Sequence, residues 1–304
     1  MSVRFLALAS ALAFTVIACA SNTFPVTTSS KRESTEAYVA SADGVSIHYV
    51  VEGRGPSVVL LHCLGCNLHY WDVAAADLAR DHRVIRLDYA GDGGSGSGRK
   101  AWGVAGFVAD ARAVIGAAGV DRFTLVGHSM SGPIGLELAQ GLGDRVVGFV
   151  PIDTLLDADE SMSEEQRAAT LTQVRTHYLD FMNGLLPHLM PQNPDPRVLA
   201  RVRADAAAKD PERTASILEW LYAYPAGERL DRLDMPIIAV DSDLRPPMLD
   251  HNRAHAPQFD VRIVEGTGHF LMLDKPTEFS STLREVIESI ESGKARRRPR
   301  PPNP

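Results

Sequence analysis

Cysteine is scarce in this chain, and aromatic residues are not abundant. Its 304 residues include 3 cysteines, too few for the disulfide framework of a small secreted domain. Aromatic residues make up only 7% of the chain, but hydrophobic residues make up 45%, which excludes a fully disordered protein. The 24 glycines follow no triplet period, which excludes a collagen-like chain. The composition therefore indicates a globular chain of one large domain or two ordinary ones.

Positive charge is also in short supply. Lysine and arginine number 31 against 38 aspartates and glutamates, and the net charge of −7 argues against nucleic acid as a partner. The end of the chain differs, because residues 292–304 carry basic side chains and no acidic one. This segment is rich in proline and arginine and offers little apolar surface to bury. We therefore predict a disordered basic tail there.

The N-terminal apolar run is too short to cross a membrane. It extends from Phe5 to Ala18 and would form a helix of about 21 Å, whereas a bilayer core is roughly 30 Å thick. Arg4 precedes the run and small residues end it, which predicts an export signal over residues 1–18. The closing residues, Val16-Ile17-Ala18-Cys19, resemble the lipobox of bacterial lipoproteins.

This resemblance implies that Cys19 is acylated and becomes the new N-terminus, anchored in the bacterial cell envelope. Ala20 follows the cysteine, which in such families favours the outer membrane. An ordinary cleaved signal that happens to contain a cysteine is the alternative. Residues 19–37 are rich in serine and threonine, so we expect a flexible tether.

Short β-branched segments alternate with helical periods through the body of the chain. Such alternation is typical of a mainly parallel, doubly wound α/β sheet with helices on both faces. We predict strands at Val45–Val51, Ser57–Leu61, Val84–Leu87, Phe123–Val126, Val146–Ile152, Ile237–Val240 and Val261–Val264. An apolar face at helical spacing runs from Val104 to Ala118.

The alternation stops once, between residues 156 and 231. Helical stretches occur there without a convincing strand, and the last strands follow afterwards. We therefore expect a helical cap inserted before the penultimate strand, covering an active site beneath it. The core domain would then comprise residues 38–155 and 232–291.

A serine lies where a strand is expected to turn sharply into a helix. The segment Gly127-His128-Ser129-Met130-Ser131-Gly132 follows the strand that ends at Val126, and a helical run comes after it. Small residues around Ser129 permit the sharp turn, which lifts the hydroxyl above the sheet and aims a helix N-terminus at it. The common form of this motif, G-x-S-x-G, ends in glycine, whereas Ser131 stands at that place here. The motif predicts a nucleophilic Ser129.

A serine hydroxyl needs a base to remove its proton. His269 follows the last predicted strand and is the candidate base. Two aspartates can serve as the acid that orients this histidine: Asp243 after the penultimate strand, and Asp153 at the end of the strand before it. The sequence favours Asp243, because an acid after the penultimate strand is the commoner arrangement.

These residues together resemble the α/β-hydrolase superfamily, in particular its capped branch of small esterases and lactonases. The resemblance covers residues 38–291 and rests on Leu60-Leu61-His62-Cys63 with Trp71 downstream, Asp88-Tyr89-Ala90-Gly91-Asp92-Gly93-Gly94-Ser95, the turn at Ser129, and Gly268-His269. It implies an oxyanion hole made by the backbone N–H groups of Leu64 and Met130. This chain departs from the family pattern at Cys63, Asp92 and Arg245, where the family often has glycine, histidine and the catalytic acid.

No cofactor or metal is expected from the motifs. The loop Gly91–Gly96 matches the dinucleotide pattern G-x-G-x-x-G, but no helix opens at its last glycine. The histidines show no zinc-protease grouping such as H-E-x-x-H. Cys63 and Cys66 form a C-x-x-C pair without a thioredoxin-like context, and a disulfide between them is an open alternative.

The sequence therefore predicts an exported serine hydrolase that acts on a small carboxylic ester or lactone. A carbon–carbon bond hydrolase and a cofactor-free perhydrolase are alternatives on the same fold. A non-catalytic envelope binding protein built on this fold is an alternative of a different class. The oligomeric state does not follow from the sequence.

Overall fold

The computed structural model describes residues 34–298. The proposed signal peptide, Cys19 and the last part of the basic tail lie outside these residues. Eight strands form one sheet: β1 (Ser34–Ala40), β2 (Ser46–Glu52), β3 (Ser57–Leu61), β4 (Arg83–Leu87), β5 (Phe123–His128), β6 (Val146–Ile152), β7 (Ile237–Ser242) and β8 (Phe259–Val264). All seven predicted strands are confirmed.

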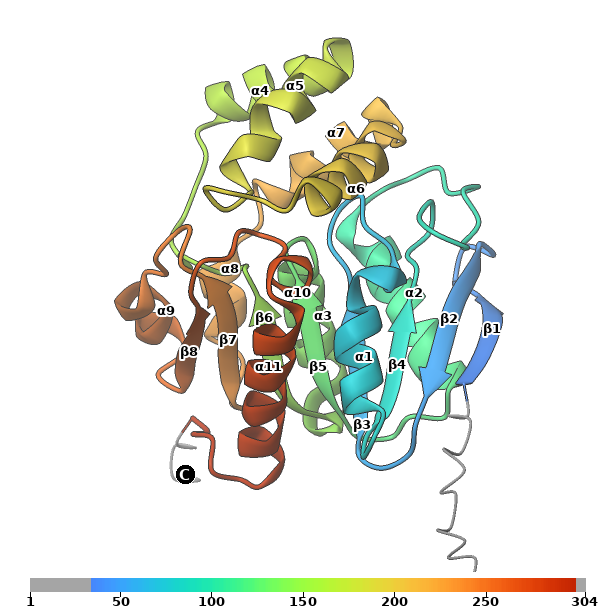
Figure 1. Ribbon diagram of the computed structural model, residues 1–304, viewed down its shortest axis with the longest axis vertical. Coiled ribbons are helices and arrows are strands. Elements are labelled where there is room, and N and C mark those ends of the chain that lie inside the picture. Colours follow the sequence, from blue (N-terminus) through green and yellow to red (C-terminus); the bar gives the residue numbers. More distant parts are fainter. Residues whose placement is uncertain (1–33, 299–304) are drawn as a thin grey trace, which may run out of the picture. The chain divides into compact units, whose positions relative to one another are not determined.

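The sheet has the order β1-β2-β4-β3-β5-β6-β7-β8 (Figure 1). Strand β2 runs antiparallel to β1 and β4, and the six strands from β4 to β8 are parallel. The order of the strands reverses next to β3, whose neighbours are β4 and β5. In open parallel sheets, ligands bind beyond the carboxyl ends of the strands at such a reversal. The mainly parallel, doubly wound α/β fold is thus confirmed.

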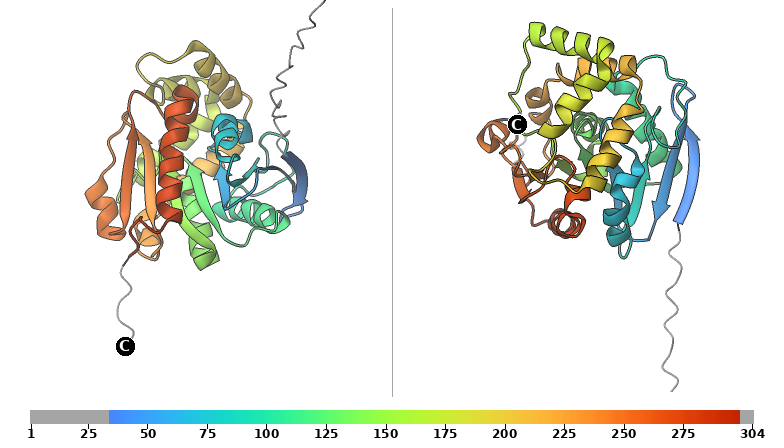
Figure 2. Two further views of the ribbon diagram at one scale, coloured as in Figure 1. Left: turned by 60° about the horizontal axis from the view of Figure 1, so that its bottom comes forward. Right: turned by 45° about the horizontal axis from the view of Figure 1, so that its top comes forward.

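Helices cover both faces of the sheet (Figures 1 and 2). Helices α2 (Val104–Ala117) and α3 (Ser131–Leu142) share one apolar cluster with one face. Helices α1 (Asp72–Leu78), α10 (Leu271–Asp274) and α11 (Pro276–Glu291) share a second cluster with the other face. Leu60 and Val59 point to opposite faces, and both are fully buried. Burial on both faces explains why the central strands read as continuous apolar runs.

Five α-helices lie between β6 and β7, where the sequence predicts the cap. They are α4 (Glu164–Thr176), α5 (Tyr178–Leu185), α6 (Pro196–Ala207), α7 (Pro211–Leu221) and α8 (Ala226–Leu230). Figure 1 shows α4 to α7 above the carboxyl ends of the strands. The cap has its own small core, formed by Leu171, Val174, Tyr178, Ala215 and Leu218. Helix α9 (Leu249–His255) follows β7. Within residues 34–298, no helix is both long and apolar enough to span a membrane.

Two boundary predictions need correction. Residues 34–37, assigned to the flexible tether, belong to the edge strand β1, which pairs along its whole length with β2. Residues 292–298, assigned to the disordered tail, lie against the domain. The backbone N–H of Arg298 donates to the carbonyl oxygen of Asp234 at 3.0 Å, and Ala295 packs on the second apolar cluster. Backbone hydrogen bonds thus hold both segments against the domain. The polar composition of the two segments does not predict these contacts.

Candidate active site

Ser129 lies in the tight turn between β5 and α3. Its φ of 55° places it in the left-handed region, which is costly for a residue with a side chain. A Cβ at position 127 would lie 2.5 Å from the Ser131 carbonyl oxygen, and one at Gly132 would lie 2.3 Å from Thr154 Oγ1. The close approaches thus fall on Gly127 and Gly132. This explains why position 131 accepts a serine in place of the usual glycine.

The hydroxyl of Ser131 links the serine turn to the neighbouring loop after β3. Its Oγ donates to the carbonyl oxygen of His62 at 2.6 Å and lies 2.9 Å from the hydroxyl oxygen of Tyr89. All three residues are essentially inaccessible to solvent. Since a buried hydrogen-bonded network is costly to disturb, it holds the β3 loop in a fixed position relative to Ser129.

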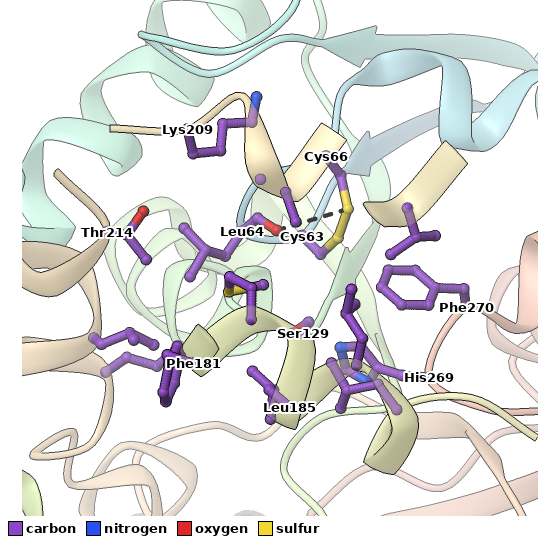
Figure 3. Close-up of a pocket in the computed structure, with 18 of the residues that line it drawn as sticks. Cys63, Leu64, Cys66, Ser129, Phe181, Leu185, Lys209, Thr214, His269 and Phe270 are labelled. Atoms are coloured by element: carbon purple, nitrogen blue, oxygen red, sulfur yellow. Dashed lines mark hydrogen bonds between the residues drawn. A yellow bond between two sulfur atoms is a disulfide. The ribbon is translucent and has the colours of Figure 1, made fainter. Parts of the chain in front are cut away.

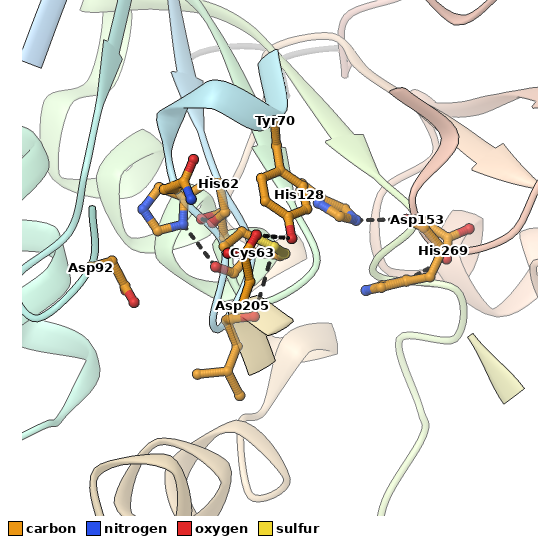
Figure 4. Close-up of a disulfide and its surroundings, with 12 residues drawn as sticks. His62, Cys63, Tyr70, Asp92, His128, Asp153, Asp205 and His269 are labelled. Carbon is orange, nitrogen blue, oxygen red and sulfur yellow. Dashed lines mark hydrogen bonds and ion pairs between the residues drawn. A yellow bond between two sulfur atoms is a disulfide. The ribbon is translucent and has the colours of Figure 1, made fainter. Parts of the chain in front are cut away.

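His62 is held in one neutral tautomer. Its Nε2 accepts the backbone N–H of Tyr89 at 3.1 Å, so its Nδ1 carries the proton and donates to the Cys63 carbonyl oxygen at 2.8 Å. Complete burial lowers its pKa and keeps the ring uncharged. Cys63 and Cys66 form a disulfide across the next turn (Figure 4). The disulfide that the sequence left open is therefore present, and it encloses Leu64.

His269 is oriented by Asp153. Its Nδ1 lies 2.6 Å from Asp153 Oδ2, and the other carboxylate oxygen accepts the backbone N–H and the hydroxyl of Ser242 at 2.9 and 2.8 Å. Burial alone would raise the pKa of Asp153, but the hydrogen bond and charge of His269 and the Ser242 donors lower it to about 2. A carboxylate in this position fixes the histidine with its proton on Nδ1 and its Nε2 free to accept another.

The sequence favours Asp243 as the partner of His269, but the structure shows Asp153 in contact with the imidazole. Asp243 is exposed, and its Oδ1 accepts the backbone N–H groups of Gly266 at 2.8 Å and Thr267 at 3.3 Å. These hydrogen bonds brace the turn that precedes His269. Asp243 thus has a structural contact close to the site, while Asp153 makes the contact with the imidazole.

Two further contacts hold the backbone of His269. Its N–H donates to the carbonyl oxygen of Leu189 in the cap at 2.8 Å, and its carbonyl oxygen accepts Nε2–H of His128 at 2.8 Å. Burial and the neighbouring His269 lower the pKa of His128 to about 3. His128 is therefore neutral and acts as a donor that positions His269.

Ser129 and His269 both line a cavity of about 340 Å³ between the sheet and the cap (Figure 3). Cys63 and Leu64 line it from the β3 loop, and its remaining lining is mainly apolar. The cap contributes Tyr178, Phe181, Met182, Leu185, Leu186 and Leu218. An apolar cavity with few polar groups beside a serine and a histidine is the usual form of a small-molecule site.

A second cavity of about 600 Å³ begins on the other side of Ser129. Met130 and Asp153 line it, together with polar residues of the loop after β6. Arg245 borders both cavities and forms an ion pair with Glu160 at 3.0 Å. Ser129 thus lies between an apolar compartment and a polar one.

Comparison with known proteins agrees with this architecture. Residues 58–282 match the family model described as "Alpha/beta hydrolase family". The chain belongs to the alpha/beta hydrolase family. An uncharacterised protein of Mycobacterium tuberculosis, Rv2715, is 26% identical over 280 residues, covering 79% of this chain and 78% of that protein.

Solved structures share the fold. An esterase from Exiguobacterium antarcticum superposes with a TM-score of 0.75 at 18% identity, covering 84% of this chain and all of that one (100%). Est816, described as an N-acyl homoserine lactone degrading enzyme, has a TM-score of 0.70 at 25% identity, covering 82% of this chain and 99% of its own. These similarities support a hydrolase fold with esterases and a lactonase among its neighbours.

Asp92, at a place where the family often has histidine, connects the core to the cap. Its carboxylate is fully buried and accepts Lys209 Nζ at 2.8 Å and Arg213 at 2.6 and 3.1 Å. Burial would raise its pKa, but Arg213 and the other positive groups hold the pKa below its ordinary value. This hydrolase therefore uses the position to hold its α6–α7 junction over the site.

The glycine-rich loop around Asp92 is not arranged for phosphate. The N–H of Gly94 donates to Asp88 Oδ2 at 2.8 Å, and a Cβ at Gly93 would meet the same carboxylate at 2.2 Å. A carboxylate therefore fills the space that a phosphate group would need. The loop instead packs around the carboxylate of Asp88.

Sequence reasoning missed three residues next to the Asp153–His269 pair: Ser242, His128 and Asp241. His128 occupies a variable position of the serine-turn motif, and Ser242 and Asp241 belong to no motif. Arg245 does give a signal in the sequence. It stands where the family often has its acid, and this favours Asp153 as the partner of His269. The structure brings together Ser129, His269 and Asp153, and places Met130 and Leu64 on the lining of the two cavities.

Asp241 is a buried carboxyl group, and neither of its oxygens has a hydrogen-bond partner among the described residues. Burial, together with the charge of Asp153, raises its pKa well above the ordinary value. As pH rises above about 4, the unfolded chain loses this proton while the folded one keeps it. Stability is therefore lost by about 1.4 kcal/mol per pH unit until the raised pKa is reached.

Replacing Asp241 with asparagine removes this titration. We expect the stability of Asp241→Asn to increase relative to the wild type as pH rises from 5 to 8, measured by urea unfolding. Asp243→Asn is the matched control, because the backbone N–H groups of Gly266 and Thr267 hold the pKa of that exposed carboxylate below its ordinary value. A stability difference between Asp241→Asn and the wild type that stays constant over this pH range would refute the explanation.

Proposed function

We propose that this chain is a serine hydrolase that cleaves a carboxylic ester or a lactone through an acyl-enzyme. The observation that carries the proposal is the contact between His269 Nδ1 and Asp153 Oδ2 at 2.6 Å beside a serine held at φ 55°. His269 and Ser129 line one cavity, so nucleophile and base face the same bound molecule. This is the residue set that acyl transfer requires.

The proposed reaction has two halves. His269 Nε2 takes the hydroxyl proton of Ser129 as Oγ bonds to the substrate carbonyl carbon, and the carbonyl oxygen becomes an oxyanion. The N–H groups of Met130 and Leu64 are proposed to hold that oxyanion. His269 then protonates the leaving oxygen, and the carbon–oxygen bond breaks.

Water completes the cycle. His269 removes a proton from water, the resulting hydroxide attacks the acyl carbonyl, and Ser129 leaves with the proton from His269. A carboxylic acid and the free serine result. Throughout, Asp153 remains ionised and stabilises the imidazolium, in line with its low pKa.

The cavity lining supports a substrate with an apolar portion. The apolar compartment of about 340 Å³ accepts an alkyl or aryl group, and the polar compartment beside Met130 accepts a more hydrophilic one. The similarity to Est816, described as an N-acyl homoserine lactone degrading enzyme, supports lactones as candidate substrates beside esters.

A substrate panel tests this function. It compares p-nitrophenyl esters of increasing acyl length, N-acyl homoserine lactones, a β-diketone and a peracid-forming assay, each with the wild type and Ser129→Ala. We expect ester or lactone cleavage that Ser129→Ala lacks. Cleavage of the β-diketone alone or peracid formation alone would move the assignment to the carbon–carbon hydrolase or the perhydrolase. An inactive but folded wild type would favour the binding protein.

We also propose that the enzyme is exported and anchored in the cell envelope by a lipid on Cys19. The support is the short apolar run that ends at this cysteine. Cys19→Ala should leave the membrane fraction and appear in the soluble one. A variant that stays with the membrane would refute the lipid anchor.

A further inference from the structure

The loop after β3 carries a disulfide at the edge of the proposed oxyanion hole. Cys63 and Cys66 are three positions apart in the chain, and both line the cavity that Ser129 and His269 also line (Figure 3). Leu64 lies between the two cysteines and lines the same cavity. The contacts that hold this short segment therefore also fix the position of the Leu64 N–H.

Both ends of this loop are hydrogen-bonded to the buried core. At its start, the carbonyl oxygen of His62 accepts the hydroxyl of Ser131 at 2.6 Å, two residues after the proposed nucleophile. At its end, the backbone N–H of Leu68 donates to Asp88 Oδ1 at 2.7 Å. These hydrogen bonds set where the loop begins and ends, so the turn between them has to be held by other contacts.

The turn itself has few non-covalent restraints. The backbone N–H of Cys66 donates to the carbonyl oxygen of Cys63 at 3.3 Å, and Gly65 has a φ of 75°. Positive φ at the third residue alone is the geometry of a type II β-turn. A Cβ at Gly65 would meet only the side chain of Lys209 within 4 Å, at 3.7 and 3.8 Å, so the cap does not press on the turn. The disulfide is therefore the main restraint on its shape.

The N–H group that this turn presents is not used inside the protein. Among residues 34–298, no group accepts a hydrogen bond from the Leu64 N–H. A backbone donor without a partner at the wall of a cavity is available to a bound molecule. We propose that the disulfide between Cys63 and Cys66 is a positioning element for catalysis. It holds the Leu64 N–H toward the oxyanion, so the enzyme is fast with the disulfide formed and slow with it reduced.

This inference rests on the acyl-enzyme reaction proposed above. Reduction adds two electrons and two protons, the sulfur–sulfur bond breaks, and two thiols form. The turn then keeps only its long backbone hydrogen bond, and Gly65 gives it access to many other conformations. Loss of one oxyanion donor lowers kcat by about 10²–10³-fold, and a donor that is in place part of the time costs less. We therefore expect reduction to lower kcat by about 10-fold or more, up to that limit.

The redox state of the surroundings would then control the reaction. Both cysteines are 2% exposed, so a reductant reaches the bond chiefly through the cavity, and a bound substrate shields it. Cytoplasmic proteins keep their thiols reduced, whereas disulfides form and persist in exported proteins. With the proposed export, the enzyme would reach its full rate only outside the cytoplasm.

Reduction of the full-length protein by the phosphine TCEP tests this inference. The phosphine takes the oxygen of one water molecule as it is oxidised, and the two sulfurs become thiols, which alkylation and mass spectrometry verify. With a p-nitrophenyl ester, we expect kcat to fall by at least about 10-fold while KM stays within about threefold. Oxidised glutathione should restore the rate. Thermal unfolding should show that the reduced enzyme is folded at the assay temperature.

Cysteine variants separate the disulfide from other effects of the reductant. The double variant Cys63→Ala/Cys66→Ala should have the low kcat of the reduced wild type and no response to TCEP. Cys19→Ala is the matched control, because it removes the third cysteine of the chain and leaves the disulfide intact. It should respond to TCEP like the wild type.

Variants of Leu64 test whether the disulfide acts through this N–H. Leu64→Pro removes the N–H, and proline is favoured at the second position of such a turn. Its kcat should fall by about 10²–10³-fold, with little further loss on reduction. Leu64→Ala also shortens the side chain but keeps the N–H, so it should still lose rate on reduction.

A trifluoromethyl ketone provides a readout that a purely structural role would not change. The Ser129 Oγ bonds to the ketone carbon, its proton passes to His269, and the ketone oxygen becomes an oxyanion. The inhibition constant should rise on reduction by the factor by which kcat/KM falls.

The outcomes distinguish this inference from the proposed function. An oxidised wild type without activity that depends on Ser129 would overturn both. An active wild type whose kcat is the same after reduction and in Cys63→Ala/Cys66→Ala would overturn only the role of the disulfide. So would a Leu64→Pro variant that still loses rate on reduction as the wild type does.

Discussion

Asp153→Asn is expected to lower kcat by about 10⁴-fold, whereas Asp243→Asn should remain within a few-fold of the wild type. In Asp153→Asn, the Ser242 donors still bind the side-chain oxygen, so the amide NH₂ faces His269 Nδ1. Nδ1 then becomes an acceptor and Nε2 carries the proton. The imidazole can no longer accept the proton of Ser129.

Steady-state kinetics with the preferred ester would measure this effect, and thermal unfolding would show that both variants are folded. In Asp243→Asn the side-chain oxygen can still accept the N–H groups of Gly266 and Thr267, which explains the small expected change. The reverse pattern, with the large loss in Asp243→Asn, would show that the acid is Asp243 in the working enzyme.

Asp92→Ala is expected to destabilise the protein by about 3–5 kcal/mol, because it leaves two cations without their buried partner. The side chains of Asp92, Arg213 and Lys209 are 0%, 5% and 14% exposed, so water does not replace the lost carboxylate. The melting temperature should fall by on the order of 10 °C. Since the ion pairs hold α6 and α7 above the cavity, ester turnover should fall as well.

Asp81→Asn serves as the control for this experiment. Asp81 also pairs with an arginine, Arg284, at 2.8 Å, but its side chain is 56% exposed. Exposed ion pairs contribute about 0–1 kcal/mol, so this variant should unfold close to the wild-type temperature. Equal effects of the two substitutions would mean that the buried cluster has no special role in holding the cap.

The central sheet could be predicted from the sequence because both of its faces are buried. Strands such as Ser57–Leu61 then read as uninterrupted apolar runs, and burial forces that pattern on the chain. The edge strand Ser34–Ala40 could not be predicted in this way. Its side chains are largely exposed, and it is held by backbone hydrogen bonds to β2, which leave little trace in composition.

The candidate nucleophile and base could be located in the sequence because each lies in the turn that follows a strand. Ser129 and His269 lie where tight turns leave β5 and β8, and local sequence encodes such turns through glycine. The choice of acid depends on where two loops meet in space. Asp153 and Asp243 both follow strands, and only the tertiary arrangement shows which one contacts the imidazole.

The positions where this chain departs from its family also gain physical explanations. Ser131 is tolerated because the close approaches in this turn fall on Gly127 and Gly132, and its hydroxyl connects the turn to His62. Arg245 can stand at the position where the family often has its acid, because Asp153 contacts His269 from the neighbouring strand. A single sequence shows these substitutions but not the contacts that compensate for them.

Labelling with a fluorophosphonate probe, followed by peptide mass spectrometry, tests the proposed serine chemistry most directly. We expect one adduct on Ser129 in the wild type, none in Ser129→Ala, and slow labelling in Asp153→Asn but not in Asp243→Asn. Folded wild-type protein that stays unlabelled, or carries the adduct on another residue, would contradict the serine mechanism.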